Sequence, residues 1–112
     1  MTTSNMWRDA LERKLSAVFA NDPDRAAARA LLLPVLDGPE GSRVAVACLK
    51  LCDGELGRLD GSVKVALTDY RDVLAWAEYP RQMRLGATAT QTAQASARRE
   101  DLKEYSRWLN DS

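Results

Sequence analysis

A run of regularly spaced apolar residues in the middle of the chain constrains the fold more than any other feature. These residues recur at alternating steps of three and four, at Leu56, Leu59, Val63, Ala66, Tyr70, Val73 and Ala77. That spacing places all of them on one side of an α-helix. Pro80 ends the pattern, because proline lacks an N–H and disfavours helical geometry in the residue before it. We therefore expect a long helix over residues 54–78 with a wide core-facing side.

Two glycines leave the start of this helix open. Gly57 and Gly61 each cost about 1 kcal/mol relative to alanine inside a helix. Either they allow a neighbouring backbone to approach closely, or the helix begins near Ser62, which is a good N-cap residue. With either start, other helices must cover the apolar side.

Composition favours helices in the rest of the chain as well. The 112 residues include 17 alanines and 15 leucines but no isoleucine, and β-branched residues are those in which strands are enriched. Periodicity and turn residues, including the helix-start pair Asp22-Pro23, define the other helices. The expected helices span about 5–20, 23–33, 42–52, 54–78 and 99–109. The sequence thus predicts an all-α bundle of four principal helices plus a short C-terminal helix, in a single domain over residues 1–112.

Pro34 and the segment after Pro80 limit these helices. The second helix should end or kink at Pro34, which cannot donate to the Ala30 carbonyl. Residues 85–97 carry no charge and almost no large apolar side chain. We expect residues 81–98 to form a low-complexity arm or linker, or a marginal helix supported by alanine. The apolar residues of the C-terminal helix must dock on this domain or on another chain, and they are Leu102, Tyr105, Trp108 and Leu109.

Charge and motifs argue against most specific activities. The 16 basic and 16 acidic residues cancel, so no overall field attracts nucleic acid or an anionic membrane. Histidine is absent, which removes the commonest general base and the usual zinc ligand. Nucleophile-elbow, phosphate-loop and calcium-loop patterns are also absent. We expect a non-enzymatic protein with no catalytic, cofactor-binding or metal-binding residues.

The two cysteines and the amino terminus favour an ordinary cytoplasmic protein. Cys48 and Cys52 do not have redox CxxC spacing and have no histidine to complete a zinc site, so we interpret them as small core residues. The amino terminus lacks the basic and then apolar regions of a secretory signal. No apolar run approaches the ~20 residues needed to cross a bilayer.

The polar cluster in the long helix has two interpretations. Asp69, Arg71 and Asp72 form a recognition surface with Trp76 and Tyr79 as aromatic anchors, or they tie neighbouring helices together. Asp69 and Asp72 alone supply too few oxygens for a hard cation. A wide apolar side and a detached amphipathic C-terminal helix favour an interaction or adaptor protein that forms a homodimer or binds a protein partner.

A basic arm supports an alternative function. Arg81, Arg84, Arg98 and Arg99 lie in a stretch that contains no acidic residue. Such an arm suits a nucleic-acid-associated regulator. Dispersed arginines are more often a solvated tail, so this function ranks second.

One segment has a recognisable likeness. DYRDVLAWAEYPR, residues 69–81, resembles a stretch in short, uncharacterised bacterial proteins. The resemblance covers little more than a tenth of the chain and implies no fold or activity. It implies only a small bacterial cytoplasmic protein.

Overall fold

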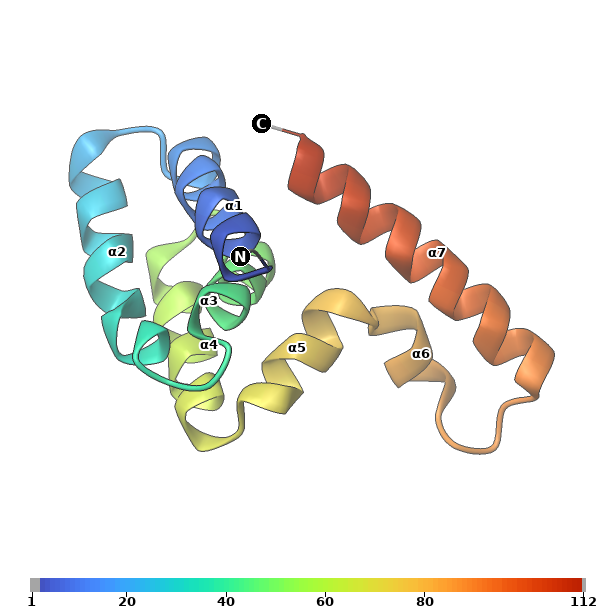
Figure 1. The fold of residues 1–112 in the computed structure, drawn as a ribbon. Helices are drawn as coiled ribbons and strands as arrows, with labels where there is room; N and C mark the ends of the chain where they lie inside the picture. Colours follow the sequence, from blue (N-terminus) through green and yellow to red (C-terminus); the bar gives the residue numbers. More distant parts are fainter. Residues whose placement is uncertain (1–2, 112) are drawn as a thin grey trace.

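The computed structural model describes residues 3–111, and every regular element in that range is an α-helix (Figure 1). The helices are α1 (Thr3–Val18), α2 (Asp22–Leu36), α3 (Gly41–Leu51), α4 (Leu56–Thr68), α5 (Tyr70–Glu78), α6 (Pro80–Leu85) and α7 (Gln91–Asn110). The all-α class is confirmed, whereas the predicted number of helices and several boundaries are wrong. Among the described helices, none combines the length and apolar character that crossing a membrane requires.

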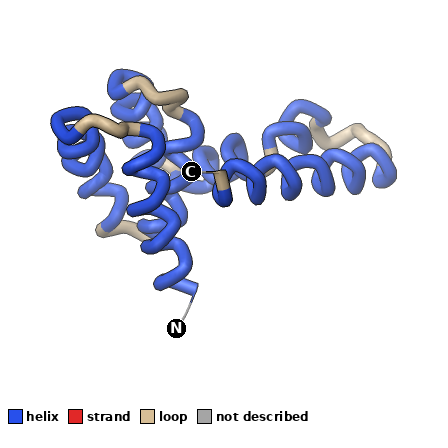
Figure 2. Tube along the Cα trace, turned by 90° about the horizontal axis from the view of Figure 1, so that it is seen from above, coloured by secondary structure: helices blue, strands red, loops and turns tan. Residues whose placement is uncertain are grey.

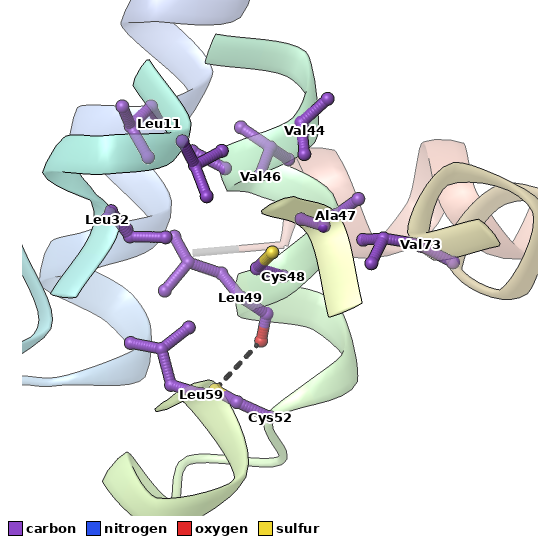
Figure 3. Packing of buried hydrophobic residues seen from close by; sticks show 14 of the residues in the cluster. Leu11, Leu32, Val44, Val46, Ala47, Cys48, Leu49, Cys52, Leu59 and Val73 are labelled. Carbon is purple, nitrogen blue, oxygen red and sulfur yellow. Dashed lines mark hydrogen bonds between the residues drawn. The ribbon is translucent and has the colours of Figure 1, made fainter. Parts of the chain in front are cut away.

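Helix α3 is the centre of the fold. It packs against α1, α2, α4 and α5, and its residues from Val44 to Leu49 are all buried. Figure 3 shows the side chains that gather around it from the other helices, including Leu11, Leu32, Leu59 and Val73. The centre is therefore α3 rather than the long helix predicted for residues 54–78.

The prediction of one long helix over residues 54–78 is wrong, because the structure has two helices there. Helix α4 ends at Thr68 and α5 begins at Tyr70, because Asp69 between them has an extended backbone with φ −153° and ψ 100°. The Asp69 carboxylate accepts a hydrogen bond from the Arg71 N–H, which is the N-cap arrangement that starts α5. The periodicity still predicted burial correctly on both sides of the break, at Leu59, Val63, Ala66, Val73 and Ala77.

The glycines of α4 lie inside the helix, which begins at Leu56 rather than near Ser62. No atom of a neighbouring element lies within 4 Å of where a Cβ on Gly57 or Gly61 would stand, so close backbone approach does not explain either. Gly41 is the opposite case. A Cβ there would lie 2.4 Å from the Leu36 carbonyl oxygen, so the tight connection between α2 and α3 requires glycine.

Helix α2 differs from prediction at both ends. Asn21 rather than Asp22 caps its start, because the Asn21 side chain accepts a hydrogen bond from the Asp24 N–H. The helix continues through Pro34 and ends at Leu36. Pro34 lies in the last turn, so the missing donor interrupts little of the helix.

The last part of the chain departs most from prediction. Residues 80–85 form α6, and α7 begins at Gln91, where the Thr90 hydroxyl accepts a hydrogen bond from the Ala93 N–H. Most of the expected 81–98 arm is therefore helical, and the C-terminal helix begins well before residue 99. Helices α6 and α7 pack as a hairpin that projects from the other helices (Figure 2).

Helix α7 is tied to its own chain at two points. Asp101, whose side chain is fully enclosed, accepts hydrogen bonds from the backbone N–H groups of Arg81 and Gln82 at 3.1 and 3.2 Å. At the other end, the Lys14 ammonium of α1 donates to the Trp108 carbonyl oxygen at 2.8 Å. The C-terminal helix therefore docks on its own domain.

Candidate functional site

The five residues predicted as an interaction surface lie on or beside α5, but they line three separate hollows. Asp69 and Arg71 line a hollow of about 340 Å³ next to the α2–α3 turn. Asp72 and Trp76 line a groove of about 580 Å³. Tyr79 lines a pocket of about 280 Å³. The fold thus divides the predicted surface into three parts.

Asp69 and Arg71 are bonded to each other. The Arg71 Nε lies 3.1 Å from the Asp69 Oδ1, the oxygen that also accepts from the Arg71 backbone N–H. The hydrogen bond from the Arg71 side chain is the main reason that the pKa of Asp69 lies below its ordinary value. This carboxylate is engaged in capping α5. Within residues 3–111, no group of three or more histidine, cysteine, aspartate and glutamate side chains is arranged to hold a metal ion.

The groove between α4 and α5 is mainly apolar. We call it the α4–α5 groove, and its lining residues are Leu51, Arg58, Gly61, Ser62, Val65, Asp72, Val73 and Trp76. Val65 is 47% exposed and Trp76 is 45% exposed, which are large fractions for apolar side chains in contact with a core. Gly61 adds no side chain to the wall. The groove therefore offers apolar surface that the described fold leaves uncovered.

The lining of the α4–α5 groove includes two exposed residues of opposite charge, Arg58 and Asp72. Arg58 is in the first turn of α4, far from the break at Asp69. Asp72 is in the first turn of α5, next to that break. Both side chains are exposed, and Arg58 forms a loose ion pair with Asp53 at 3.5 Å. The groove thus combines an apolar wall with one charge of each sign.

The hollow that Tyr79 lines is bordered by α1, α3, α5 and α7 and has a partly buried ion pair in its wall. We call it the Tyr105 pocket, and its lining residues are Trp7, Glu40, Arg43, Glu78, Tyr79, Leu102 and Tyr105. The Arg43 Nε and Nη2 donate to the two carboxylate oxygens of Glu78 at 2.9 and 2.7 Å. The Arg43 Nη1 also donates to Glu40 at 3.1 Å. Both glutamates are thus engaged by one guanidinium, whose pKa they raise.

The Tyr105 side chain is buried without a hydrogen bond. The residue is only 7% exposed, and its hydroxyl has no partner among the described residues. The ring is held by stacking on Trp108, with centroids 5.8 Å apart, and by the Lys50 ammonium at 5.7 Å. Burial, followed by the nearby Glu78 carboxylate, raises the pKa of Tyr105 above its ordinary value. The hydroxyl therefore keeps its proton and remains a donor.

Sequence reasoning missed Arg43, Glu78 and Tyr105 as a group. One signal was present, because Glu78 follows Leu74 by one helical turn and so falls on the buried side of α5. A charged residue at such a position requires a partner. The identity of that partner is not visible in the sequence, because Arg43 lies in another helix.

The predicted basic arm does not remain a group of uncompensated charges. Arg81 pairs with Asp101 at 3.2 Å and with Glu104 at 2.7 Å. Arg84 lies on α6, and Arg98 and Arg99 lie on α7, all three exposed. Asp101 and Glu104 come after the arm in the sequence, and the α6–α7 hairpin brings both of them next to Arg81.

The cysteines are core residues, as predicted. Cys48 and Cys52 are free thiols, both buried, and the Cys52 thiol donates to the Leu49 carbonyl oxygen at 3.2 Å (Figure 3). Burial raises the pKa of Cys48 to about 12. Because the thiolate is the reactive form, this environment disfavours redox or nucleophilic chemistry.

Comparisons with protein-family models, with curated proteins and with solved structures find no match to this chain.

Proposed function

We propose that this chain is a non-enzymatic interaction protein that pairs with a second copy of itself through the α4–α5 groove. The observation that carries the proposal is the combination of a half-exposed Trp76 with an apolar groove whose lining includes one exposed charge of each sign. Tryptophan and arginine are the residues most enriched among those that dominate binding energy at protein interfaces.

The charge pattern of the α4–α5 groove is self-complementary. In a two-fold symmetric dimer, each copy presents the same patch in the opposite direction. Arg58 of one copy then meets Asp72 of the second copy, and the second contact repeats the first. The apolar groove, about 580 Å³ in volume, receives the Trp76 side chain of the other copy. A single surface thus supplies both the apolar anchor and its charged rim.

Light scattering after size-exclusion chromatography tests the proposal, with the chain at about 100 μM so that weak association is populated. We expect a dimer mass for the unmodified chain and a monomer mass for Trp76→Ala. Leu33→Ala is the matched control, because Leu33 is an exposed apolar residue of α2 outside the groove. A monomer mass for the unmodified chain at this concentration contradicts the proposal.

A charge exchange distinguishes this interface from any other dimer contact. Arg58→Asp and Asp72→Arg each place like charges opposite one another and should weaken the dimer. The double variant Arg58→Asp/Asp72→Arg restores both opposite-charge pairs and should recover the dimer. If the double variant dimerises no more strongly than the single variants, the dimer contact lies elsewhere on the surface.

The nucleic-acid alternative has weaker support. Arg81 is paired with two carboxylates, which leaves Arg84, Arg98 and Arg99 as the other arginines of the predicted arm, and they are spread over α6 and α7. Binding through them would weaken steeply with salt and disappear in Arg84→Ala/Arg98→Ala/Arg99→Ala.

A further inference from the structure

We propose that the Tyr105 pocket binds a trimethylammonium group, held by the aromatic rings of its wall and by an excess of negative charge. This site is separate from the α4–α5 groove and shares none of its lining residues. The proposal therefore stands or falls independently of the dimer.

Aromatic side chains are concentrated in this pocket. Three of the chain's seven aromatic residues line it, namely Trp7, Tyr79 and Tyr105. The Tyr105 ring already stacks on Trp108, so the rings that remain for a ligand are Trp7 and Tyr79, both partly exposed. A ligand in a hollow of only about 280 Å³ lies close to both of them. Because the face of an aromatic ring attracts a nearby cation, this wall favours a positively charged ligand.

The charged side chains of the pocket carry one negative charge in excess. Glu40 and Glu78 both bond to Arg43, so two carboxylates share one guanidinium. Beyond the lining, Lys50 is balanced by Glu104, with which it forms an ion pair at 3.6 Å. The excess charge attracts a cation and repels an anion.

The hydrogen bonds of the pocket decide the kind of cation. All four carboxylate oxygens of Glu40 and Glu78 already accept from the Arg43 guanidinium. A primary ammonium group has three N–H donors that need acceptors when it leaves water. A trimethylammonium group has no such donor, so ring contacts and the excess charge suffice to hold it. The group also fits, because a cavity of about 150 Å³ accommodates benzene and this pocket is about 280 Å³.

Choline and 3,3-dimethylbutan-1-ol test this inference, because they have nearly the same shape and only choline is charged. Each is titrated into the full chain up to about 20 mM at constant ionic strength, so that millimolar binding is populated. The measurement is the shift of the Trp7 indole resonance in nuclear magnetic resonance spectra. We expect saturable shifts and a dissociation constant about tenfold lower for choline than for the alcohol. Ethanolamine, which lacks the three methyl groups, should bind more weakly than choline.

A further probe identifies the source of the group. Acetyl-trimethyllysine methylamide carries it on a protein side chain, whereas choline carries it on a small molecule. The tighter of these two ligands assigns the source. In either case the trimethylated lysine probe should bind more tightly than acetyl-lysine methylamide, as choline should bind more tightly than ethanolamine.

Glu40→Gln removes the excess charge and keeps the size of the side chain, which is 51% exposed. The dissociation constant for choline should rise about threefold, while that for the alcohol stays the same. Glu100→Gln removes an exposed charge outside the pocket and should change neither constant. Tyr79→Phe keeps the ring and should retain the preference for choline, whereas Tyr79→Leu should lose most of it.

The comparison of choline with its uncharged analogue on the unmodified chain does not depend on whether a variant folds. Absence of saturable shifts with choline, equal binding of choline and the alcohol, or a preference for choline that is unchanged in Glu40→Gln overturns the proposal.

Discussion

The Lys14 ammonium donates a hydrogen bond to the Trp108 carbonyl oxygen at 2.8 Å and lies 4.2 Å from the centre of the Trp108 ring. It also donates to the Asp111 carbonyl oxygen at 2.7 Å. Trp108 lies in the last turn of α7 and Asp111 is its C-cap, at the end of the helix where the dipole is negative. A cation from α1 thus caps α7 and fastens it to the first helix.

Replacing Lys14 tests the strength of this cap. Lys14→Met keeps the aliphatic stem but removes the donor, so the free energy of unfolding should fall by about 2 kcal/mol. Arg8→Met on the same helix is the control, because Arg8 is exposed, and it should change stability by less than about 0.5 kcal/mol. Urea denaturation measures both. Equal effects of the two substitutions would show that the cap contributes nothing.

Asp101 connects α7 to α6 in the hairpin, as Lys14 connects α7 to α1. Its enclosed carboxylate accepts from two backbone N–H groups at the start of α6 and from the Arg81 side chain at 3.2 Å. Asp101→Asn replaces one acceptor oxygen with a donor and should lower the free energy of unfolding by about 2–3 kcal/mol. Hydrogen exchange at the Arg81 and Gln82 amides should accelerate. Glu100→Gln, an exposed neighbour on α7, should leave both quantities nearly unchanged.

Two glycine-to-alanine substitutions should have opposite signs. In Gly41→Ala the new methyl group meets the Leu36 carbonyl oxygen at 2.4 Å, so the α2–α3 connection must shift and stability should fall by about 2 kcal/mol or more. In Gly57→Ala the methyl group meets no neighbouring element and improves the helix propensity of α4. That substitution should raise stability by about 1 kcal/mol. Thermal unfolding in which both variants move in the same direction would refute this assignment.

Acid should weaken the chain partly through Glu104. The hydrogen bond from Arg81 lowers the pKa of Glu104 below its ordinary value of 4.5. A carboxyl whose folded-state pKa is lowered contributes stability above its unfolded pKa, and this contribution is lost as the pH falls through the folded pKa. Unfolding free energies at about pH 6 and about pH 3 should therefore differ less in Glu104→Gln than in the unmodified chain. The exposed pair limits the difference to less than about 1 kcal/mol. Glu55→Gln, at an exposed position, is the control.

The helical pattern was largely visible in the sequence, but the break at Asp69 was not. The apolar residues keep their spacing across Asp69, so the periodicity continues although the helix does not. Neither Thr68 nor Asp69 occupies one of the regularly spaced apolar positions, so the pattern is the same with or without a break between them. The available signal was local, because aspartate is a strong N-cap residue. The sequence therefore predicted correctly which of these residues are buried, although it predicted one helix where there are two.

The start of α7 was hidden for a different reason. Residues 91–97 are uncharged and have no large apolar side chain, so no amphipathic pattern marks a helix there. Tertiary contacts supply the rest, through Ala97, Asp101 and Tyr105 on one buried face. Leu102, which was expected on that face, is 54% exposed.

Pairings between distant positions were beyond the reach of the sequence. The residue types of Asp72 and Trp76 suit an interface, and the structure places both in the α4–α5 groove. The contact between Arg43 and Glu78 spans 35 positions and depends on how α3 crosses α5. Composition and spacing describe single helices, whereas such a pocket forms only when helices meet.

The Lys14 cap also has a consequence for the order of events during synthesis. Lys14 and Trp108 are 94 positions apart. At about 5–20 residues per second, a ribosome needs several seconds to deliver the second after the first. For that interval the ammonium stays hydrated, and the earlier helices must hold together by their own contacts. The Lys14 cap can therefore form only after the residues between Lys14 and Trp108 have been synthesised.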